Sequence, residues 1–486
     1  MISALFHTPS IRVDAYDFFE RLRSLSSRTE RLVSLYARSN GNTTIVLTLV
    51  IETPERLEAL QSVIARAAGF QSLTRELPAC HIFEREIFES QAALPHGHPW
   101  LKPVRFSGEH QGKTASYPFY RVEGKEVHEV GVGPIHAGVI EPGHFRFQCL
   151  GETVQHLEIQ LGFQHRGVEQ LLLARPPWSL APLVETISGD SSVAHAWAYA
   201  SALEGSCGMG ATPETLLGRG IALELERIAM HLAGLSGLAT DIGFLQGAAS
   251  YGRLRTTAIN TSLLLCGSRF GRGWLRPGGT RACMDAETAA QVRFNLALLG
   301  RDSALIHQHF RAARSVRHRL EGVGTLTAAQ AAELGFVGMV ARSSGVPLDA
   351  RSHTRASAPY SELRPELCVE AGGDCWARAL LRMREIDVSL SWLAAALDAC
   401  PLLEPSYQEP MPLRPEQLSV ALCEGWRGEV VHCLETDSNG ALQHYRVQDP
   451  SLRNWFAVAL AVRDQGISDF PICNKSFDLS YCGNDL

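Results

Sequence analysis

A polar, glycine-containing stretch from Ser107 to Lys125 divides this chain into two parts with different hydrophobic patterns. A chain of 486 residues is too long for one ordinary hydrophobic core. Helical and strand patterns mix in residues 1–106, whereas helical spacing dominates after about residue 150. We therefore predict an α+β chain with a small N-terminal domain at 1–106, a linker at 107–127 and a mainly helical domain at 128–486.

The N-terminal part carries signals for both kinds of secondary structure. Apolar residues recur with helical spacing from Ala15 to Leu32, and Thr44 to Ile51 is a β-branched run that predicts a strand. Thr53 followed by Pro54 is typical of a helix start, with a capping threonine and proline in the first turn. These patterns predict an α+β unit.

The second part begins with glycines and short alternating runs between 128 and 150, which favour strands and a hairpin. Residues 420–448, with Asn439-Gly440 inside them, predict a second hairpin. Between these hairpins, one apolar stripe indicates a long helix: Leu225, Ile228, Leu232 and Leu235.

Composition excludes several classes of function. The net charge of -6 gives no general attraction to nucleic acid or anionic lipid. No apolar run approaches the roughly 18 to 20 residues that a bilayer needs, and the N-terminus lacks the pattern of a signal peptide. The 12 cysteines include no CxxC pair, so we expect reduced cytosolic thiols and no iron-sulfur cluster held by this chain. No GxGxxG follows a strand into a helix, so direct NAD binding is expected on another subunit.

Ordered blocks of sequence carry a family resemblance. Residues 133–147 (GPIHAGVIEPGHFRF) and 161–169 (LGFQHRGVE) resemble the large subunit of formate hydrogenlyase, a group 4 nickel-iron hydrogenase, and the 49-kilodalton (D) subunit of complex I. Residues 83–88 (FEREIF) and 97–100 (GHPW) are similar to the 30-kilodalton (C) subunit of complex I. The resemblance implies a C-like domain fused to a D-like domain with the hydrogenase large-subunit fold.

Four positions depart from that resemblance. The family's two cysteine pairs, CGIC and DPCxxC, hold nickel and iron; they align here with Ser188, Ser191, Ser480 and Gly483. A serine hydroxyl is a poor ligand for a metal that prefers thiolate, and glycine has no side chain. We therefore expect no metal bound by this chain. The sequence ends three residues after Gly483, so we also expect no C-terminal extension to be removed.

The same resemblance supplies candidate site residues. Glu141 aligns with a glutamate that passes protons to and from the metal; the alternative is a capping or ion-paired carboxylate. His136 and Tyr199 align with segments that line the quinone cavity of complex I, although the second histidine of that pattern is Ile140 here. His195 is either a cavity residue, a ligand together with Cys482, Cys473 or Asp190, or a satisfied core histidine.

By resemblance, the chain is a subunit of a membrane-associated complex I-like oxidoreductase, peripheral on the cytoplasmic face. Its partners would be an iron-sulfur protein similar to the small (B) subunit of complex I and a membrane protein similar to the (H) subunit of complex I. Its role would be to shape the cavity for an electron acceptor, with quinone possible, and to couple redox change to ion movement. A purely structural scaffold and an active nickel-iron hydrogenase are the alternatives.

Overall fold

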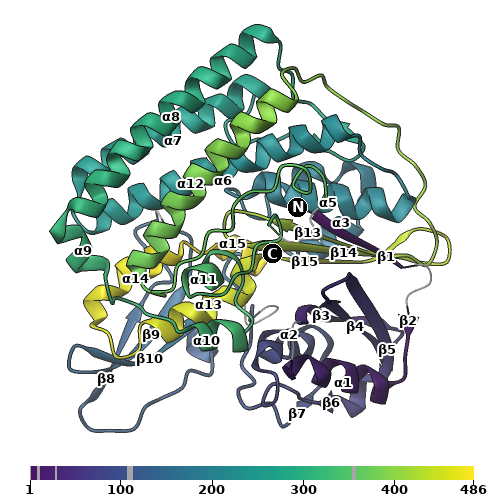
Figure 1. The fold of residues 1–486 in the computed structure, drawn as a ribbon. Helices are drawn as coiled ribbons and strands as arrows, with labels where there is room; N and C mark the ends of the chain where they lie inside the picture. The colour runs from purple at the N-terminus through teal and green to yellow at the C-terminus, as the bar shows by residue number, and fades with distance from the viewer. Residues whose placement is uncertain (1, 8–10, 28–29, 107–112, 139, 353–356) are drawn as a thin grey trace.

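The computed structural model describes residues 2–7, 11–27, 30–106, 113–138, 140–352 and 357–486. Figure 1 shows a small α+β unit at the lower right, a central sheet, and a layer of long helices above it. A third sheet lies at the lower left, near the C-terminal helices. No helix within these ranges is both long and apolar enough to span a membrane.

The N-terminal sheet has the strand order β2-β5-β4-β3, in which β4 (Thr44–Glu52) pairs antiparallel with both β3 (Arg31–Asn40) and β5 (Leu57–Ala65). The short strand β2 (Ile11–Arg12) pairs with β5 in parallel. Strand β4 is apolar on both faces because each face is covered by a different layer. Alternate residues therefore enter two separate cores.

Helices α1 (Ala15–Arg23) and α2 (His81–Gln91) cover one face, where they pack on Ile45, Leu47 and Leu49. The other face is buried against the central sheet. There Val33, Tyr36 and Val50 share one apolar cluster with residues of β13 (Leu418–Glu424) and β14 (Glu429–Thr436): Leu418, Val420, Leu422, Val431 and Cys433. The two expected parts are thus joined by a packed interface between sheets.

The central sheet has the order β1-β13-β14-β15 and is antiparallel throughout. Its edge strand β1 (Ile2–His7) comes from the beginning of the chain, whereas β13 (Leu418–Glu424), β14 (Glu429–Thr436) and β15 (Leu442–Gln448) come from near the end. Residues 2–7 therefore belong structurally to the sheet of the later part, although the sequence assigns them to the first domain.

Long helices form the layer above this sheet: α5 Ser192–Cys207, α6 Pro213–Asp241, α7 Leu245–Cys266, α8 Ala286–Ala312 and α12 Cys375–Ala399 (Figure 1). The third sheet is β8 Val127–Val132, β9 His144–Leu150 and β10 Thr153–Gln160, and beside it lie α13 Pro450–Ala461, α14 Phe470–Phe477 and α15 Tyr481–Asp485. Two short strands, β6 Phe70–Gln71 and β7 Pro95–His96, belong to the N-terminal unit. The short elements of the later part are α3 Val168–Leu173, α4 Ala181–Val184, β11 Leu275–Arg276, β12 Gly279–Thr280, α9 Arg314–Leu320, α10 Ala328–Glu333 and α11 Gly338–Ser343.

A buried network of charges ties the helices to the sheet. Arg342 of α11 contacts Glu385 of α12 at 2.9 Å and Glu424 of β13 at 2.7 Å. Arg351 contacts Glu224 of α6 at 3.0 Å. All five side chains are buried. Removing one partner of such a pair leaves an uncompensated buried charge, so the network fixes how these elements meet.

Two local predictions are wrong. The helix expected from Ala15 to Leu32 ends at Arg23, and β3 begins at Arg31. The helix expected at Thr53 is a turn: the Thr53 hydroxyl accepts from the backbone N–H of Arg56 at 3.1 Å, as a helix cap would, but the chain then reverses into β5. The apolar residues that follow alternate and pair with β4, which outweighs the capping signal. The expected linker falls partly on residues 107–112, outside the described residues, and β8 begins at its end.

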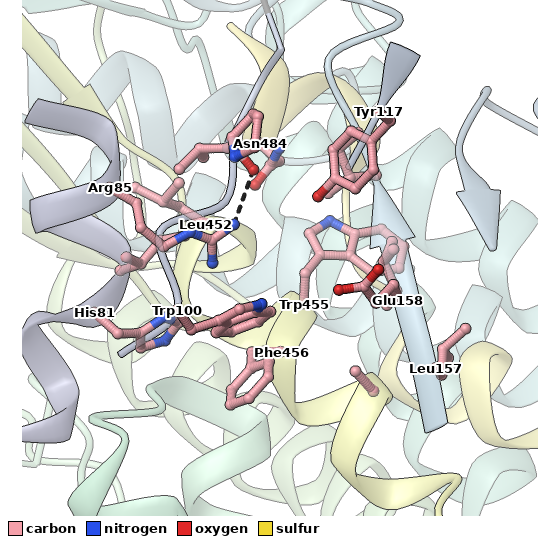
Figure 2. Close-up of a pocket in the computed structure, with 16 residues that line it drawn as sticks. His81, Arg85, Trp100, Tyr117, Leu157, Glu158, Leu452, Trp455, Phe456 and Asn484 are labelled. Carbon is pink, nitrogen blue, oxygen red and sulfur yellow. Dashed lines mark hydrogen bonds between the residues drawn. The ribbon is translucent and has the colours of Figure 1, made fainter. Parts of the chain in front are cut away.

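Aromatic side chains fill the contact between α2 and α13. Trp100 packs on His81 and Phe456 with ring centroids 5.9 and 4.7 Å away, and the Arg85 guanidinium lies 4.5 Å from its ring centroid. Figure 2 shows these side chains around a small cavity of about 60 Å³, with Arg85 donating to the Pro103 carbonyl at 2.8 Å. This contact holds the N-terminal unit against the C-terminal helices.

A buried ion pair lies close to this aromatic contact. Glu86 of α2 pairs with both Arg105 and Arg446, the latter from β15. Burial opposes ionisation of Glu86, but the two arginines outweigh it and lower its pKa to about 2. The N-terminal unit is thus fixed to the rest of the molecule by both apolar and charged contacts.

Candidate functional site

A cavity of about 660 Å³ lies between the third sheet and α14. Phe145 and Phe147 of β9 and Phe470 of α14 form part of its apolar wall. Charged groups also face it: Glu141, Asp190, Arg427, Lys475, Asp241 and Asp478. A mostly apolar cavity with a few convergent charged groups is the usual form of a ligand site.

The positions aligned with the metal ligands lie together beside Asp190 and Arg427, which line the cavity, but the four positions themselves do not line it. The Ser188 hydroxyl is 3.0 Å from the Ser480 hydroxyl, although 292 residues separate them. Ser480 caps the start of α15 and accepts from the backbone N–H of Gly483 at 2.9 Å. Ser191 immediately precedes α5. The fold therefore brings all four substituted positions to one place.

Arg427 occupies the centre of this cluster. Its guanidinium donates to both carboxylate oxygens of Asp190, at 2.6 and 2.5 Å, and lies within 3.5 Å of the Ser188 and Ser191 hydroxyls. The same group stacks on Trp426, 4.0 Å from the ring centroid. Burial disfavours the charge of Asp190, but Arg427 and the Ser188 hydroxyl outweigh it and lower the pKa of Asp190. The ion pair thus joins the segment of Ser188 and Ser191 to the turn between β13 and β14, and Arg427 reaches the C-terminal segment through the carbonyl oxygen of Asp478.

These residues do not fit the family's nickel-iron group. Three hydroxyls and a glycine supply no thiolate, and thiolate is the donor that this group requires. A Cβ on Gly483 would also come within 2.6 Å of the Asp449 carboxyl carbon, so a cysteine here would displace Asp449. No group of three or more metal-binding side chains was found among the described residues. No step through such a metal follows from this arrangement.

Glu141 lies on the loop between β8 and β9, half-buried at the cavity wall. The Glu141 carboxylate acts on the nearby Cys482 thiol, whose sulfur is 3.4 Å from the Ser480 hydroxyl. Burial and the Glu141 charge raise the pKa of Cys482 to about 11, so the thiol keeps its proton. Glu141, Cys482, Ser480 and Ser188 therefore form a connected polar chain.

His136 also lines the cavity, on the same loop as Glu141. Its Nε2 lies 2.8 Å from the carbonyl oxygen of Gly143, a hydrogen bond that closes the loop on itself. Ile140, which aligns with the second histidine of the complex I pattern, is 49% exposed. The loop therefore presents one imidazole and one carboxylate to the cavity.

His195 lies behind the cavity wall and is fully buried. Its Nε2 is 3.1 Å from Asp449, its Nδ1 is 3.1 Å from His432, and His432 is 2.9 Å from the Tyr445 hydroxyl. One set of neutral tautomers satisfies the whole chain: Tyr445 donates to His432, His432 to His195, and His195 to Asp449. Burial and the neighbouring His195 keep the pKa of His432 well below its ordinary value, in accord with this assignment.

Tyr199 does not line the cavity. Its side chain is buried on α5, and its hydroxyl donates to the carbonyl oxygen of Pro177 at 2.5 Å. Burial raises the pKa of Tyr199 well above its ordinary value. The structure therefore brings His136 and Glu141 together with the substituted positions, but it places Tyr199 and His195 in the surrounding core.

Sequence reasoning missed Arg427, Lys475 and Asp449. Arg427 lies in the short turn between β13 and β14, where a charged residue is ordinarily exposed, and Lys475 is the basic residue in the last turn of α14. Asp449 resembles a helix cap, and it does accept from the Ser451 backbone at 2.8 Å. Each has a plausible local explanation in sequence, so only the three-dimensional arrangement identifies it.

Comparison with known proteins gives a consistent assignment. The model of the family described as respiratory-chain NADH dehydrogenase, 49 Kd subunit, matches residues 241–419. The chain is 30% identical to the carbon monoxide-induced hydrogenase of Rhodospirillum rubrum over 72% of this chain and 96% of that protein. It is 26% identical to hydrogenase-4 component G of Escherichia coli over 92% of this chain and 81% of that protein. Formate hydrogenlyase subunit 5 of the same species is 28% identical over 87% and 78%.

Among solved structures, a chain of the membrane-bound sulfane sulfur reductase, an archaeal respiratory membrane complex, has the same fold. The superposition has a TM-score of 0.69 at 24% sequence identity. It covers 76% of this chain and 100% of the other chain.

Proposed function

Because this chain belongs to the family of group 4 hydrogenase large subunits and the related 49-kilodalton subunit of complex I, we propose that it is a subunit of a membrane-associated oxidoreductase complex. In this proposal the cavity of about 660 Å³ receives the electron acceptor, with quinone the first candidate. Glu141 holds and releases protons at the cavity wall. The chain itself is not a competent hydrogenase.

The observation that carries the proposal is the polar chain at the end of the cavity. The Glu141 charge acts on the Cys482 thiol, Cys482 contacts Ser480, and Ser480 contacts Ser188. A carboxylate at a cavity wall with connected hydroxyl and thiol groups can exchange protons with a bound molecule without a metal. The apolar wall suits the ring and tail of an acceptor such as a quinone.

The proposal assigns the remaining components to partners. Iron-sulfur clusters reside on a protein similar to the small (B) subunit of complex I, and a membrane protein similar to the (H) subunit of complex I anchors the assembly. The chain itself binds no cofactor and lies on the cytoplasmic face of the membrane. Hydrogenase and respiratory-complex relatives support this arrangement, because their names describe parts of multi-subunit enzymes.

A purely structural role is the second candidate, and one observation favours it. The Asp190–Arg427 ion pair lies beside the positions that align with the family's metal ligands, and Arg427 also donates to the carbonyl oxygen of Asp478 on the other side. A site closed in this way fixes the two segments even with no molecule in the cavity.

Glu141→Gln in the assembled complex separates the two candidates. The substitution keeps the volume and removes the proton acceptor, so we expect electron transfer coupled to proton movement to be lost while assembly stays normal. Glu129→Gln is the matched control, since Glu129 lies on neighbouring β8 and is paired with Arg146 at 2.8 Å. Coupled turnover would be measured on purified complex in vesicles. Normal turnover in both variants contradicts the proposal and favours the scaffold.

A further inference from the structure

Two buried cysteines from distant parts of the sequence meet behind the cavity wall. Cys375 is the first residue of α12, and Cys473 lies in α14. Arg378 Nη2 lies 3.4 Å from the Cys375 sulfur, and a Cβ on Gly324 would come within 3.1 Å of that nitrogen and 2.5 Å of the Cys473 sulfur, so the two sulfurs lie beside one guanidinium. Both cysteine side chains are at most 1% exposed.

The surroundings of Cys375 favour its thiolate. Arg378 Nη2 lies 3.4 Å from the Cys375 sulfur, and the other hydrogen bonds of this guanidinium go to a hydroxyl and two carbonyl oxygens. The sulfur also lies at the start of a 25-residue helix, capped by Asp374, where the helix dipole favours negative charge. Burial opposes ionisation of Cys375, but the neighbouring Cys473 thiol and the Arg378 guanidinium outweigh it and lower the pKa of Cys375 to about 6.

From this geometry we infer that Cys375 and Cys473 are a peroxide-reactive pair that closes reversibly to a disulfide. The attacking group is the Cys375 thiolate, and Cys473 is the resolving thiol. The oxidant is hydrogen peroxide, a small neutral molecule that can reach a buried thiol more readily than a larger oxidant.

Each step of this reaction balances in atoms and electrons. The Cys375 thiolate attacks one peroxide oxygen, the O–O bond breaks, and the products are a Cys375 sulfenic acid and hydroxide, which takes a proton to become water. The Cys473 sulfur then attacks the Cys375 sulfur, the S–O bond breaks, and the oxygen leaves as a second water with the Cys473 proton. Two thiols lose two electrons in total, and one peroxide becomes two waters.

The disulfide would fasten one wall of the cavity. Helix α14 presents Pro471, Asn474 and Lys475 to the cavity, whereas Cys473 faces α12. In the oxidised pair, an S–S bond of about 2.05 Å joins Cys375 to Cys473, and this bond ties α14 to α12. This consequence rests on the proposed function of the cavity, but the disulfide itself does not.

Other thiols of the chain lack this environment. Burial raises the pKa of Cys266 to about 11, although its side chain is more exposed than that of Cys375. Burial likewise raises the pKa of Cys423 to about 12. Reactivity should therefore follow charge environment and not exposure, which makes Cys266→Ser a suitable control.

Peptide mapping of the full-length protein tests the inference. Protein treated with a small molar excess of hydrogen peroxide is denatured, alkylated and digested, and the peptides are identified by mass spectrometry. We expect the Cys375 and Cys473 peptides to be joined and to separate again after reduction. In Cys473→Ser, the Cys375 sulfenic acid should persist and react with dimedone. Cys266→Ser should form the disulfide as the unaltered chain does.

Recovery of both cysteines as alkylated thiols after peroxide would overturn the inference, and so would a disulfide between other cysteines. Presence or absence of the Cys375–Cys473 disulfide is measured in the unaltered chain, so the test is decided even if Cys473→Ser fails to fold. The result is also independent of turnover by the complex. A disulfide that forms while Glu141→Gln remains fully active upholds the reactive pair and rejects the proposed function of the cavity.

Discussion

Arg427 is the residue on which the arrangement of the site depends. It binds Asp190 with the two terminal nitrogens of its guanidinium, stacks on Trp426, and donates through Nε to the carbonyl oxygen of Asp478. Asp190 lies between Ser188 and Ser191, and Asp478 precedes Ser480 by two residues. A charge buried among these partners is stabilised only while all of them are present. The site is therefore held together by one ion pair at the positions that align with the family's metal-binding cysteines.

At this scale, Tyr199→Phe tests whether the Tyr199 hydroxyl serves the fold. Removing the hydroxyl leaves the Pro177 carbonyl without its partner, and the free energy of unfolding should fall by about 1 kcal/mol. Tyr16→Phe, at an exposed position of α1, is the control and should change nothing. Urea unfolding measures both. A Tyr199→Phe protein as stable as the original, with weaker turnover of the complex, would instead place the hydroxyl in acceptor binding.

The sequence allowed the substituted positions Ser188, Ser191, Ser480 and Gly483 to be grouped, because they align with ligands of one metal in the family. It could not show what fills the space. Arg427 lies far from these positions in sequence and carries no motif of its own. Tyr199 aligns with a cavity residue of complex I, but its hydroxyl is bonded to a local carbonyl, which an alignment does not reveal.

At the scale of the elements, the start of α5 is hydrogen-bonded to a carboxyl group of α6. Glu226 accepts from the backbone N–H groups of Val193 at 2.7 Å and Ala194 at 3.2 Å. Burial, together with the charge of Asp190, raises the pKa of Glu226 to about 8 against these hydrogen bonds. At neutral pH the group therefore keeps its proton in the folded chain, whereas in the unfolded chain, with a pKa near 4.5, it is ionised.

The stability of the protein should consequently depend on pH through Glu226. Between about pH 4.5 and pH 8 the folded state binds more protons than the unfolded state, so this group's contribution weakens as pH rises, by about 1.4 kcal/mol per pH unit. Glu226→Gln removes the titration, and its stability relative to the original protein should improve from pH 5 to pH 8. Glu214→Gln, exposed at the start of α6, is the control. A stability difference that stays constant across this range would show that Glu226 does not titrate there.

Several elements follow directly from sequence pattern. The apolar run at Thr44 to Ile51 is strand β4, and Asn439-Gly440 lies in the turn between β14 and β15. The stripe from Leu225 to Leu235 lies within α6. The helix expected at Thr53 fails because a cap is a local signal, whereas pairing with β4 is a long-range one.

At the scale of the whole molecule, the early and late parts of the chain are interleaved. Strand β1 enters the central sheet beside β13, and the N-terminal sheet packs on that same sheet through Tyr36 and Val50. Glu86, Arg105 and Arg446 add a buried ion pair across this contact. No sequence pattern within either part indicates these contacts, since each depends on residues several hundred positions away.

We propose that the chain retains the hydrogenase large-subunit fold and that the Ser188, Asp190 and Arg427 cluster takes the place of the nickel-iron centre. Metal analysis of the complex, purified without chelators and assayed in parallel for hydrogen evolution, is the decisive experiment. We expect nickel far below one atom per chain, no hydrogen evolution, and iron only in proportion to the partner's clusters. Stoichiometric nickel accompanied by hydrogen evolution would contradict this proposal.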